Sequence, residues 1–176
     1  MQARKEEQML QSNEANQGLL AGYKGGQEMP LAGYATLLGV YNAALAAALL
    51  AAKHSGRDLP ARTSYSDLLL LGIATHKLGR IITKDWVTSP LRAPFTEYQE
   101  SAGGGEVNEK SRGEGLQRAV GDLLTCPWCI APWVAGALAF GFVFKPRTTR
   151  FICTVFSAVT ISDFLQHRYN AVKKKK

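Results

Sequence analysis

The sequence predicts an all-α integral membrane protein, a helical bundle of about four spans with a long cytoplasmic connection between the second and the third. Two uncharged runs, 31–52 and 123–144, are each long enough to cross a bilayer as a helix. Two further apolar runs, 68–83 and 151–165, contain few charged residues. Basic residues flank these runs, whereas in a nucleic-acid-binding protein they would alternate with polar and aromatic residues on one face. We therefore expect a lipid bilayer as partner and no nucleic acid.

The composition agrees with this class only when it is taken segment by segment. The 176 residues carry a net charge of +7, and their mean hydropathy of −0.09 is typical of a soluble protein. That average hides a polar tail over 1–29, predicted to be disordered, and a polybasic tail over 171–176 that could attract anionic lipids. The helical membrane domain is expected over 30–170. Three cysteines, an odd number, argue against a disulfide framework.

The first two spans differ in polarity. The first, 31–52, is followed by Lys53-His54-Ser55-Gly56, which is typical of a helix C-terminus. In the second, 68–83, His76 and Arg80 are four residues apart and share one helix face. This segment is either a span whose polar end lies at headgroup depth or an amphipathic helix in the interface, and we favour the span.

The connection over 87–121 is long and polar. Pro90, Pro94 and three glycines at 103–105 exclude one continuous helix, and the glycine run is interpreted as a flexible connection. The charged residues here are expected to form a solvated loop packed over the cytoplasmic helix ends; the alternative is contact with lipid headgroups or another protein. The residues concerned are Lys84, Asp85, Arg92, Glu106 and Arg112.

The third and fourth spans are predicted to form an antiparallel hairpin, because only a short basic turn joins them. Residues 115–122 are expected to begin a helix that leads into the third span, 123–144. Pro127 and Pro132 interrupt this span. The fourth span covers 151–165.

The basic residues also predict an orientation. Four spans put both termini and the long connection on one side, which carries more lysines and arginines than the two short links. The positive-inside rule then predicts a multi-pass protein with both termini in the cytoplasm. The bias is moderate, because the short links are basic as well.

The most distinctive chemical motif is Cys126-Pro127-Trp128-Cys129, where the third span begins. As a redox pair, Cys126 and Cys129 would need one thiolate of lowered pKa, which a helix N-terminus can provide. As a zinc site they would need two more ligands, for which His76 and His167 are candidates. In the third interpretation both cysteines are small packing residues. No cofactor is predicted, and zinc stays an open alternative; on the cytoplasmic side the thiols would be kept reduced.

Ionisable side chains from two other helices are expected in the same layer. Asp163 interrupts the fourth apolar run, and its charge is costly in lipid unless a partner neutralises it. Arg80 is the predicted partner. A structural ion pair joining two helices is at least as good an interpretation of these residues as a functional site.

Several short motifs between 66 and 169 carry a family resemblance. They are Thr75-His76-Lys77-Leu78, Thr83-Lys84-Asp85, Val87–Thr96, Gly105-Glu106-Val107, Arg112-Gly113 and Leu124–Cys129. In combination they resemble a small bacterial integral membrane protein family, the domain of unknown function thirteen-sixty. The resemblance implies a location in the bacterial inner membrane and no particular activity.

The leading hypothesis for function is a non-catalytic structural or assembly partner of a membrane complex. The alternative is a membrane-embedded thiol redox or zinc-binding module that uses the Cys-x-x-Cys motif at the cytoplasmic helix end. Whether the protein is an enzyme therefore stays open at the level of sequence.

Overall fold

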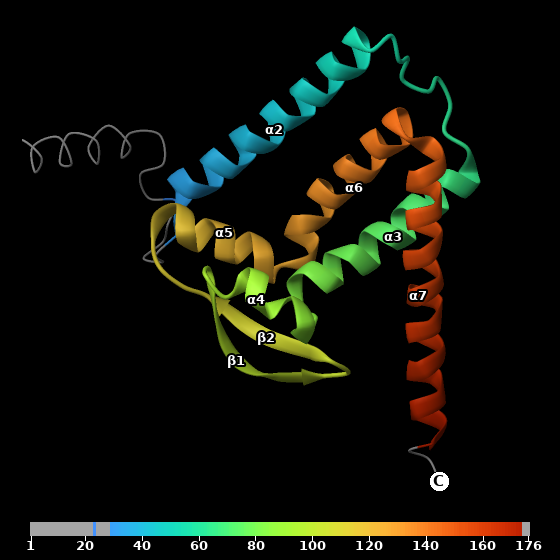
Figure 1. Ribbon diagram of the computed structural model, residues 1–176. Helices are drawn as coiled ribbons and strands as arrows, with labels where there is room; N and C mark the ends of the chain where they lie inside the picture. Colours follow the sequence, from blue (N-terminus) through green and yellow to red (C-terminus); the bar gives the residue numbers. More distant parts are fainter. Residues whose placement is uncertain (1–22, 24–28, 174–176) are drawn as a thin grey trace, which may run out of the picture.

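The computed structural model describes Tyr23 and residues 29–173, so most of the predicted N-terminal tail and the last three lysines lie outside the described part. Within it the chain forms six α-helices, a short 3-10 turn and a β-hairpin (Figure 1). The helices are α2 (Leu31–His54), α3 (Tyr65–Thr83), α4 (Ser89–Arg92), α5 (Gly115–Thr125), α6 (Pro127–Phe144) and α7 (Pro146–Lys173). The 3-10 turn η1 is Trp86–Thr88, and strands β1 and β2 are Thr96–Gly103 and Glu106–Ser111.

Long helices occur where the four apolar runs predict them, but the prediction of an all-α protein is wrong over 96–111. There β1 and β2 form an antiparallel hairpin. The turn residues Gly103–Gly105 have φ values of 79°, 62° and 83°, which glycine adopts without steric cost. Across the strands Glu97 faces Lys110, an opposite-charge pair that stabilises strand pairing. The glycine run is therefore the turn of a hairpin and not a flexible connection.

The predicted end of the first apolar helix is found close to its expected position, whereas α7 continues to Lys173, eight residues beyond the predicted end at 165. After α2, Gly56 has a φ of 63°, and its N–H donates to the carbonyl oxygen of Lys53. The third predicted span is two helices, because α5 ends at Thr125 and α6 begins at Pro127. Pro132 lies inside α6 without ending it.

α2 and α6 run in the same direction. Arg57, just beyond α2, donates to the carbonyl oxygens of Val143 and Phe144 at the end of α6, at 3.2 and 2.7 Å. At the other end of α2, Gly33 lies so close to Ala119 of α5 that no side chain would fit between them. Since α5 leads directly into α6, the starts of α2 and α6 lie at one end of the molecule.

α3 and α7 run the opposite way, parallel to each other. Asp67 near the start of α3 pairs with Arg150 near the start of α7 at 2.7 Å, and Lys77 pairs with Asp163 farther along both helices at 2.9 Å. The predicted antiparallel hairpin of α6 and α7 is present, with Lys145 as its turn. Both short links therefore lie at one end, and the β-hairpin and the end of α7 lie at the other (Figure 1).

Small residues form the contact between α3 and α7. The buried positions of α7 are Cys153, Ser157 and Thr160, and also Thr149, which packs against Gly141 of α6. The hydroxyl of Ser157 donates to the carbonyl oxygen of Leu70 at 3.3 Å, so the two backbones approach closely. Small and hydroxyl-bearing residues play this role in membrane helix bundles. Most large apolar side chains lie outside this contact and are exposed.

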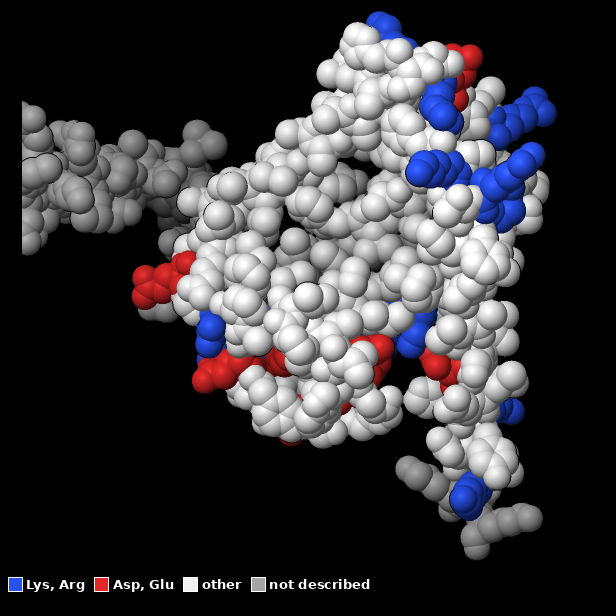
Figure 2. All heavy atoms as spheres, viewed as in Figure 1, with Lys and Arg blue, Asp and Glu red and all other residues white. Residues whose placement is uncertain are grey.

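The charged residues gather at the two ends. Figure 2 shows a broad uncharged band over α2, α6 and α3, between charges at the short links and charges over the hairpin. Among the described helices, α2 and α6 are long and apolar enough to cross a membrane, yet only 6% and 11% of their apolar windows are buried. α3 and α7 form as predicted but are less apolar, so the count of four spans stays a prediction.

Candidate functional site

Arg92 is a fully buried arginine within the charged end. Its side chain is 1% exposed, and its Nε and Nη2 donate to the carboxylate of Glu109 at 2.5 and 3.3 Å. Its other acceptors are the carbonyl oxygens of Ile82 and Asp85 and the hydroxyl oxygens of Thr88 and Ser89. Every guanidinium nitrogen therefore has a partner, as burial of this group requires.

The Arg92 cluster fastens the hairpin to the end of α3. The Ile82 carbonyl belongs to the last turn of α3, where backbone acceptors lack helical partners, and Glu109 belongs to β2. The expectation that Arg92 lies in a solvated loop, or contacts headgroups, is wrong. Its guanidinium and the Glu109 side chain, 5% exposed, are both shielded from solvent.

Of the other predicted loop residues, some belong to this joint between the hairpin and the end of α3, and others lie at the surface. The Lys84 carbonyl accepts the N–H of Val107 at 2.9 Å, and Asp85 pairs through its backbone with Glu106. Arg112 is exposed and donates to the carbonyl oxygen of Pro94 at 3.3 Å. Backbone contacts of the loop thus build the joint, a role that side-chain chemistry in the sequence does not reveal.

A cavity of about 870 Å³, here called the α3–α7 cavity, lies between the C-terminal halves of α3 and α7 and the hairpin turn. Residues predicted to share one layer do line it: His76, Arg80, Asp163 and His167. Their pairing differs from the prediction. Asp163 pairs with Lys77, while Arg80 forms a two-point ion pair with Glu106 in which the Nε bond is 2.8 Å.

The predicted pair of Arg80 with Asp163 is therefore wrong. Lys77 lies one turn nearer the start of α3 than Arg80, and it is the Lys77 ammonium that contacts the Asp163 carboxylate. The hairpin, which the sequence did not predict, brings Glu106 to Arg80. Asp163 and Arg80 are both neutralised, but by other partners than predicted: Asp163 by Lys77, one helical turn from Arg80, and Arg80 by Glu106 of β2.

Cys126 and Cys129 are joined by a disulfide at the start of α6, where two reduced thiols were expected. Their Cα atoms are 5.2 Å apart, within the range for this bond. The bend between α5 and α6 explains the difference. Cys126 has an extended backbone, so its Sγ turns back over the first turn of α6 and accepts the N–H of Cys129 at 3.2 Å.

The predicted zinc set is not assembled in the described part of the chain. His76 and His167 line the α3–α7 cavity, and neither Cys126 nor Cys129 does. Among the described residues, no group of three or more His, Cys, Asp or Glu side chains could hold a metal ion. The Cys-x-x-Cys motif and the histidines are therefore separate features.

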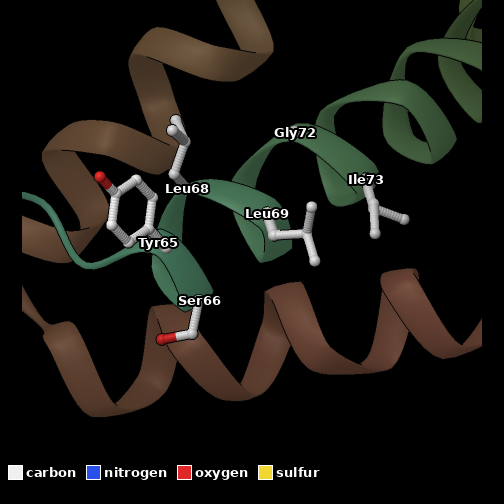
Figure 3. A pocket seen from close by; sticks show the side chains of 6 residues that line it. All are labelled: Tyr65, Ser66, Leu68, Leu69, Gly72 and Ile73. Carbon is white, nitrogen blue, oxygen red and sulfur yellow. The ribbon is translucent and has the colours of Figure 1, made fainter.

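A second hollow, of about 620 Å³, is open and apolar (Figure 3). It follows the first turns of α3 and is lined by Tyr65, Ser66, Leu68, Leu69, Gly72 and Ile73. Leu68 and Leu69 are 56% and 66% exposed, and Gly72 contributes no side chain, which leaves the space. This mostly apolar lining suits an apolar chain.

Comparison with known proteins adds a family. The family model described as "Protein of unknown function (DUF1360)" matches residues 70–169, more than half of the chain. The chain belongs to this family. The DUF1360 match confirms the resemblance seen in the sequence. It runs from α3 into α7 and includes the hairpin and the Cys-x-x-Cys motif, whereas α2 lies outside it.

The DUF1360 chain is also similar to two proteins of Bacillus subtilis (strain 168). It is 26% identical to Sporulation protein YjcA over 102 residues, which are 56% of this chain and 86% of that protein. It is 31% identical to UPF0713 protein YngL over 87 residues, which are 49% of this chain and 65% of that protein, slightly under two thirds. No solved structure matches the chain. None of these names states a reaction or a substrate.

Proposed function

We propose that this DUF1360 protein crosses the bacterial inner membrane four times, with its termini and hairpin in the cytoplasm. There it acts as a non-catalytic structural or assembly partner of a membrane complex. The observation that carries the membrane part is the uncharged band of exposed apolar helices between two charged ends (Figure 2).

The exposure of large apolar side chains supports a lipid environment. Leu38 and Leu50 of α2 are 64% and 57% exposed, and Phe151 of α7 is 70% exposed. Soluble proteins rarely expose contiguous apolar patches larger than a few hundred Å². An apolar core helix of a soluble protein would be buried, whereas α2 and α6 are mostly exposed. Lipid chains would cover this surface.

The helix directions support four crossings. Consecutive long helices alternate in direction, so each of the links between them can lie outside the bilayer. The Lys77–Asp163 pair neutralises charges on α3 and α7 that would otherwise be costly in an apolar layer. Trp86 and Trp128, 51% and 85% exposed, lie near the end of α3, as expected of side chains at a membrane interface.

Two observations support the assembly role. Val87 of η1 and Leu91 of α4 are 84% and 76% exposed at the charged end, where apolar side chains suit contact with another protein. The relative YjcA is named a sporulation protein, which gives a cellular process and no reaction. A non-catalytic role agrees with such a name.

Labelling with a membrane-impermeant maleimide tests the topology. Cys126, Cys129 and Cys153 are replaced by serine, and single cysteines are placed by Arg62→Cys, Arg147→Cys or Lys110→Cys. In intact spheroplasts the two link positions should react, while the hairpin position should react only after lysis. The reverse pattern would overturn the orientation. Equal labelling of all three positions in intact spheroplasts would overturn the four-span arrangement.

Native gels of mild-detergent extracts test the assembly role. The chain should migrate in a complex larger than itself, and Val87→Glu combined with Leu91→Glu should release it. Leu116→Glu, which changes a residue of α5 that is 51% exposed, is the matched control and should leave the complex intact. A wild-type chain that migrates alone would contradict the assembly role and leave the topology untouched.

A thiol redox role for Cys126 and Cys129 is the second candidate function. The disulfide between them favours it over zinc binding, which would need both sulfurs as free thiolates. The bond also lies at a helix start, the environment that lowers the pKa of a thiol.

A further inference from the structure

The two sulfurs of the Cys126–Cys129 disulfide have different surroundings. Cys129 is exposed, whereas Cys126 is partly buried at the bend between α5 and α6. The Sγ of Cys126 accepts the N–H of Cys129 at 3.2 Å, and its carbonyl oxygen accepts the N–H groups of Cys129 and Ile130. A nucleophile from solution therefore reaches the sulfur of Cys129 more easily.

The same geometry determines which sulfur leaves. Attack on Cys129 expels Cys126 as a thiolate at the N-terminus of α6, an 18-residue helix. The positive end of the helix dipole and the N–H of Cys129 both stabilise that thiolate. A more stable thiolate is a better leaving group in thiol–disulfide exchange. Access and leaving-group stability thus favour the same bond-breaking event.

The surroundings also favour reversibility. Pro127 fixes the first helical residue after Cys126, and the 5.2 Å between the Cα atoms allows the bond to close without backbone movement. On the cytoplasmic side, where the proposed topology places this pair, disulfides are transient and serve catalysis or redox sensing. Cys153 is fully buried in α7 and lies outside this exchange.

Building on the second candidate function, we propose that Cys126 and Cys129 form a reversible disulfide that exchanges with a small cytosolic dithiol protein, with Cys129 carrying the mixed disulfide. A thiolate of the partner attacks Sγ of Cys129, and the bond to Cys126 breaks as Cys126 leaves as a thiolate. The second thiolate of the partner then attacks the first sulfur of the partner in the mixed disulfide, and Cys129 is released as a thiolate.

This sequence is balanced. The partner loses two thiol protons and two electrons and gains a disulfide, while Cys126 and Cys129 gain the electrons and take up the protons. The reverse sequence, with an oxidised partner of the same class, restores the Cys126–Cys129 bond.

The first test uses the full chain with Cys153→Ser, purified in detergent and equilibrated with mixtures of reduced and oxidised dithiothreitol. Alkylation and intact mass should show two thiols appearing together and disappearing together, while circular dichroism shows that the helices persist. A bond that opens only after unfolding, or thiols that never pair under oxidised dithiothreitol, would overturn the proposal. The chain that also carries Cys126→Ser and Cys129→Ser is the control and should show no transition.

The second test identifies the attacked sulfur. The oxidised chain is mixed with reduced glutathione and quenched early with N-ethylmaleimide, and the peptides are analysed by mass. Glutathione should be found on Cys129 and maleimide on Cys126, in at least about tenfold excess over the opposite arrangement. Equal amounts, or an excess on Cys126, would refute the assigned roles.

Detergent-solubilised protein has no cytoplasmic side, so these tests do not depend on the topology. Labelling of Lys110→Cys from outside the cell would overturn the orientation and leave a positive exchange result standing. An absent redox transition would remove the exchange proposal and leave both the orientation and the assembly role standing.

Discussion

At the scale of single residues, Arg92 shows why a charged residue in a polar connection is hard to interpret from sequence. Arg92 and Arg112 both lie in the polar connection, yet one is buried in a cluster and the other is exposed. Thr88 and Ser89, two hydroxyl residues within four positions of Arg92, are the only local signal of its acceptors among the described residues. Glu109 becomes a partner only through the hairpin.

Removal of the Arg92 side chain should destabilise the fold strongly. Arg92→Ala would leave the Glu109 carboxylate buried without its partner, and loss of one member of a buried pair costs about 3–5 kcal/mol. Unfolding in detergent followed by circular dichroism measures the effect. Arg112→Ala, at an exposed position, should change the free energy of unfolding by less than about 0.5 kcal/mol. Similar losses for both variants would contradict the buried cluster.

The ion pairs of α3 can be distinguished by double-mutant cycles. Lys77→Ala and Asp163→Ala should be coupled by about 1 kcal/mol, because the two side chains are in contact. Arg80→Ala and Asp163→Ala should be additive, since Arg80 is paired with Glu106. The unfolding free energies of the four chains in each cycle show whether the two substitutions are coupled or additive. Coupling of Arg80 with Asp163 would restore the pairing predicted from the sequence.

At the scale of elements, the sequence predicts helices well and the hairpin not at all. The apolar runs 31–52 and 151–165 predict the helices found over 31–54 and 146–173, although not the last two turns of α7, and the end of α2 follows from a lysine and a glycine. β1 is exposed at all positions but the first, so it lacks the alternation that predicts a half-buried strand. The hairpin depends on its turn glycines and on contacts with α5, which only the folded chain provides.

The same limit applies to the candidate site. The shared layer of His76, Arg80, Asp163 and His167 follows from helix spacing and was predictable. Pro127, next to Cys126, packs against Gly79 of α3 at the same level, yet Cys126 does not line the cavity, and this was not predictable. It depends on the bend between α5 and α6, whose angle no residue pattern specifies.

Two glycines of α2 provide a matched test of the contact with α5. Gly33→Ala would place a Cβ 2.7 Å from the Cβ of Ala119, so backbone must shift, at a cost of about 1–3 kcal/mol. Gly39→Ala meets nothing within 4 Å and should stabilise the helix by up to about 1 kcal/mol. Thermal unfolding in detergent should move the two variants in opposite directions. A neutral Gly33→Ala would mean that α2 does not rest on α5.

At the scale of the whole molecule, two of the basic residues at the short links have structural partners. Arg57 binds the last carbonyl oxygens of α6 and lies over the ring of Phe144, and Arg150 binds Asp67. These cations hold helix ends together. The hairpin end also has paired cations, among them Arg92 with Glu109 and Arg80 with Glu106, so these structural partners leave the charge bias between the two ends as the sequence predicts it.

Tryptophan fluorescence in vesicles tests the uncharged band. Chains that keep only one of Trp86, Trp128 and Trp133, with phenylalanine at the other two, are reconstituted with lipids brominated at shallow or deep acyl positions. Trp133, which packs against Tyr41 within the band, should be quenched best by deep bromines, and the other two by shallow ones. Deep quenching of Trp86 would place the end of α3 inside the bilayer and contradict the four-span arrangement.

The parallel pairing of α3 and α7 has a consequence for synthesis. Asp67 leaves the ribosome 83 residues before its partner Arg150, so at bacterial rates of elongation α3 waits about 4–17 s for α7. During that delay Lys77 has no Asp163, and we expect α3 to lie along the membrane surface until α7 arrives. Surface-bound and inserted forms of α3 would then be successive stages of one pathway. In a ribosome-stalled chain that ends before Pro146, cysteines placed one at a time at Ser66 and Lys84 should be labelled from the same side of the membrane, because α3 between them has not yet crossed.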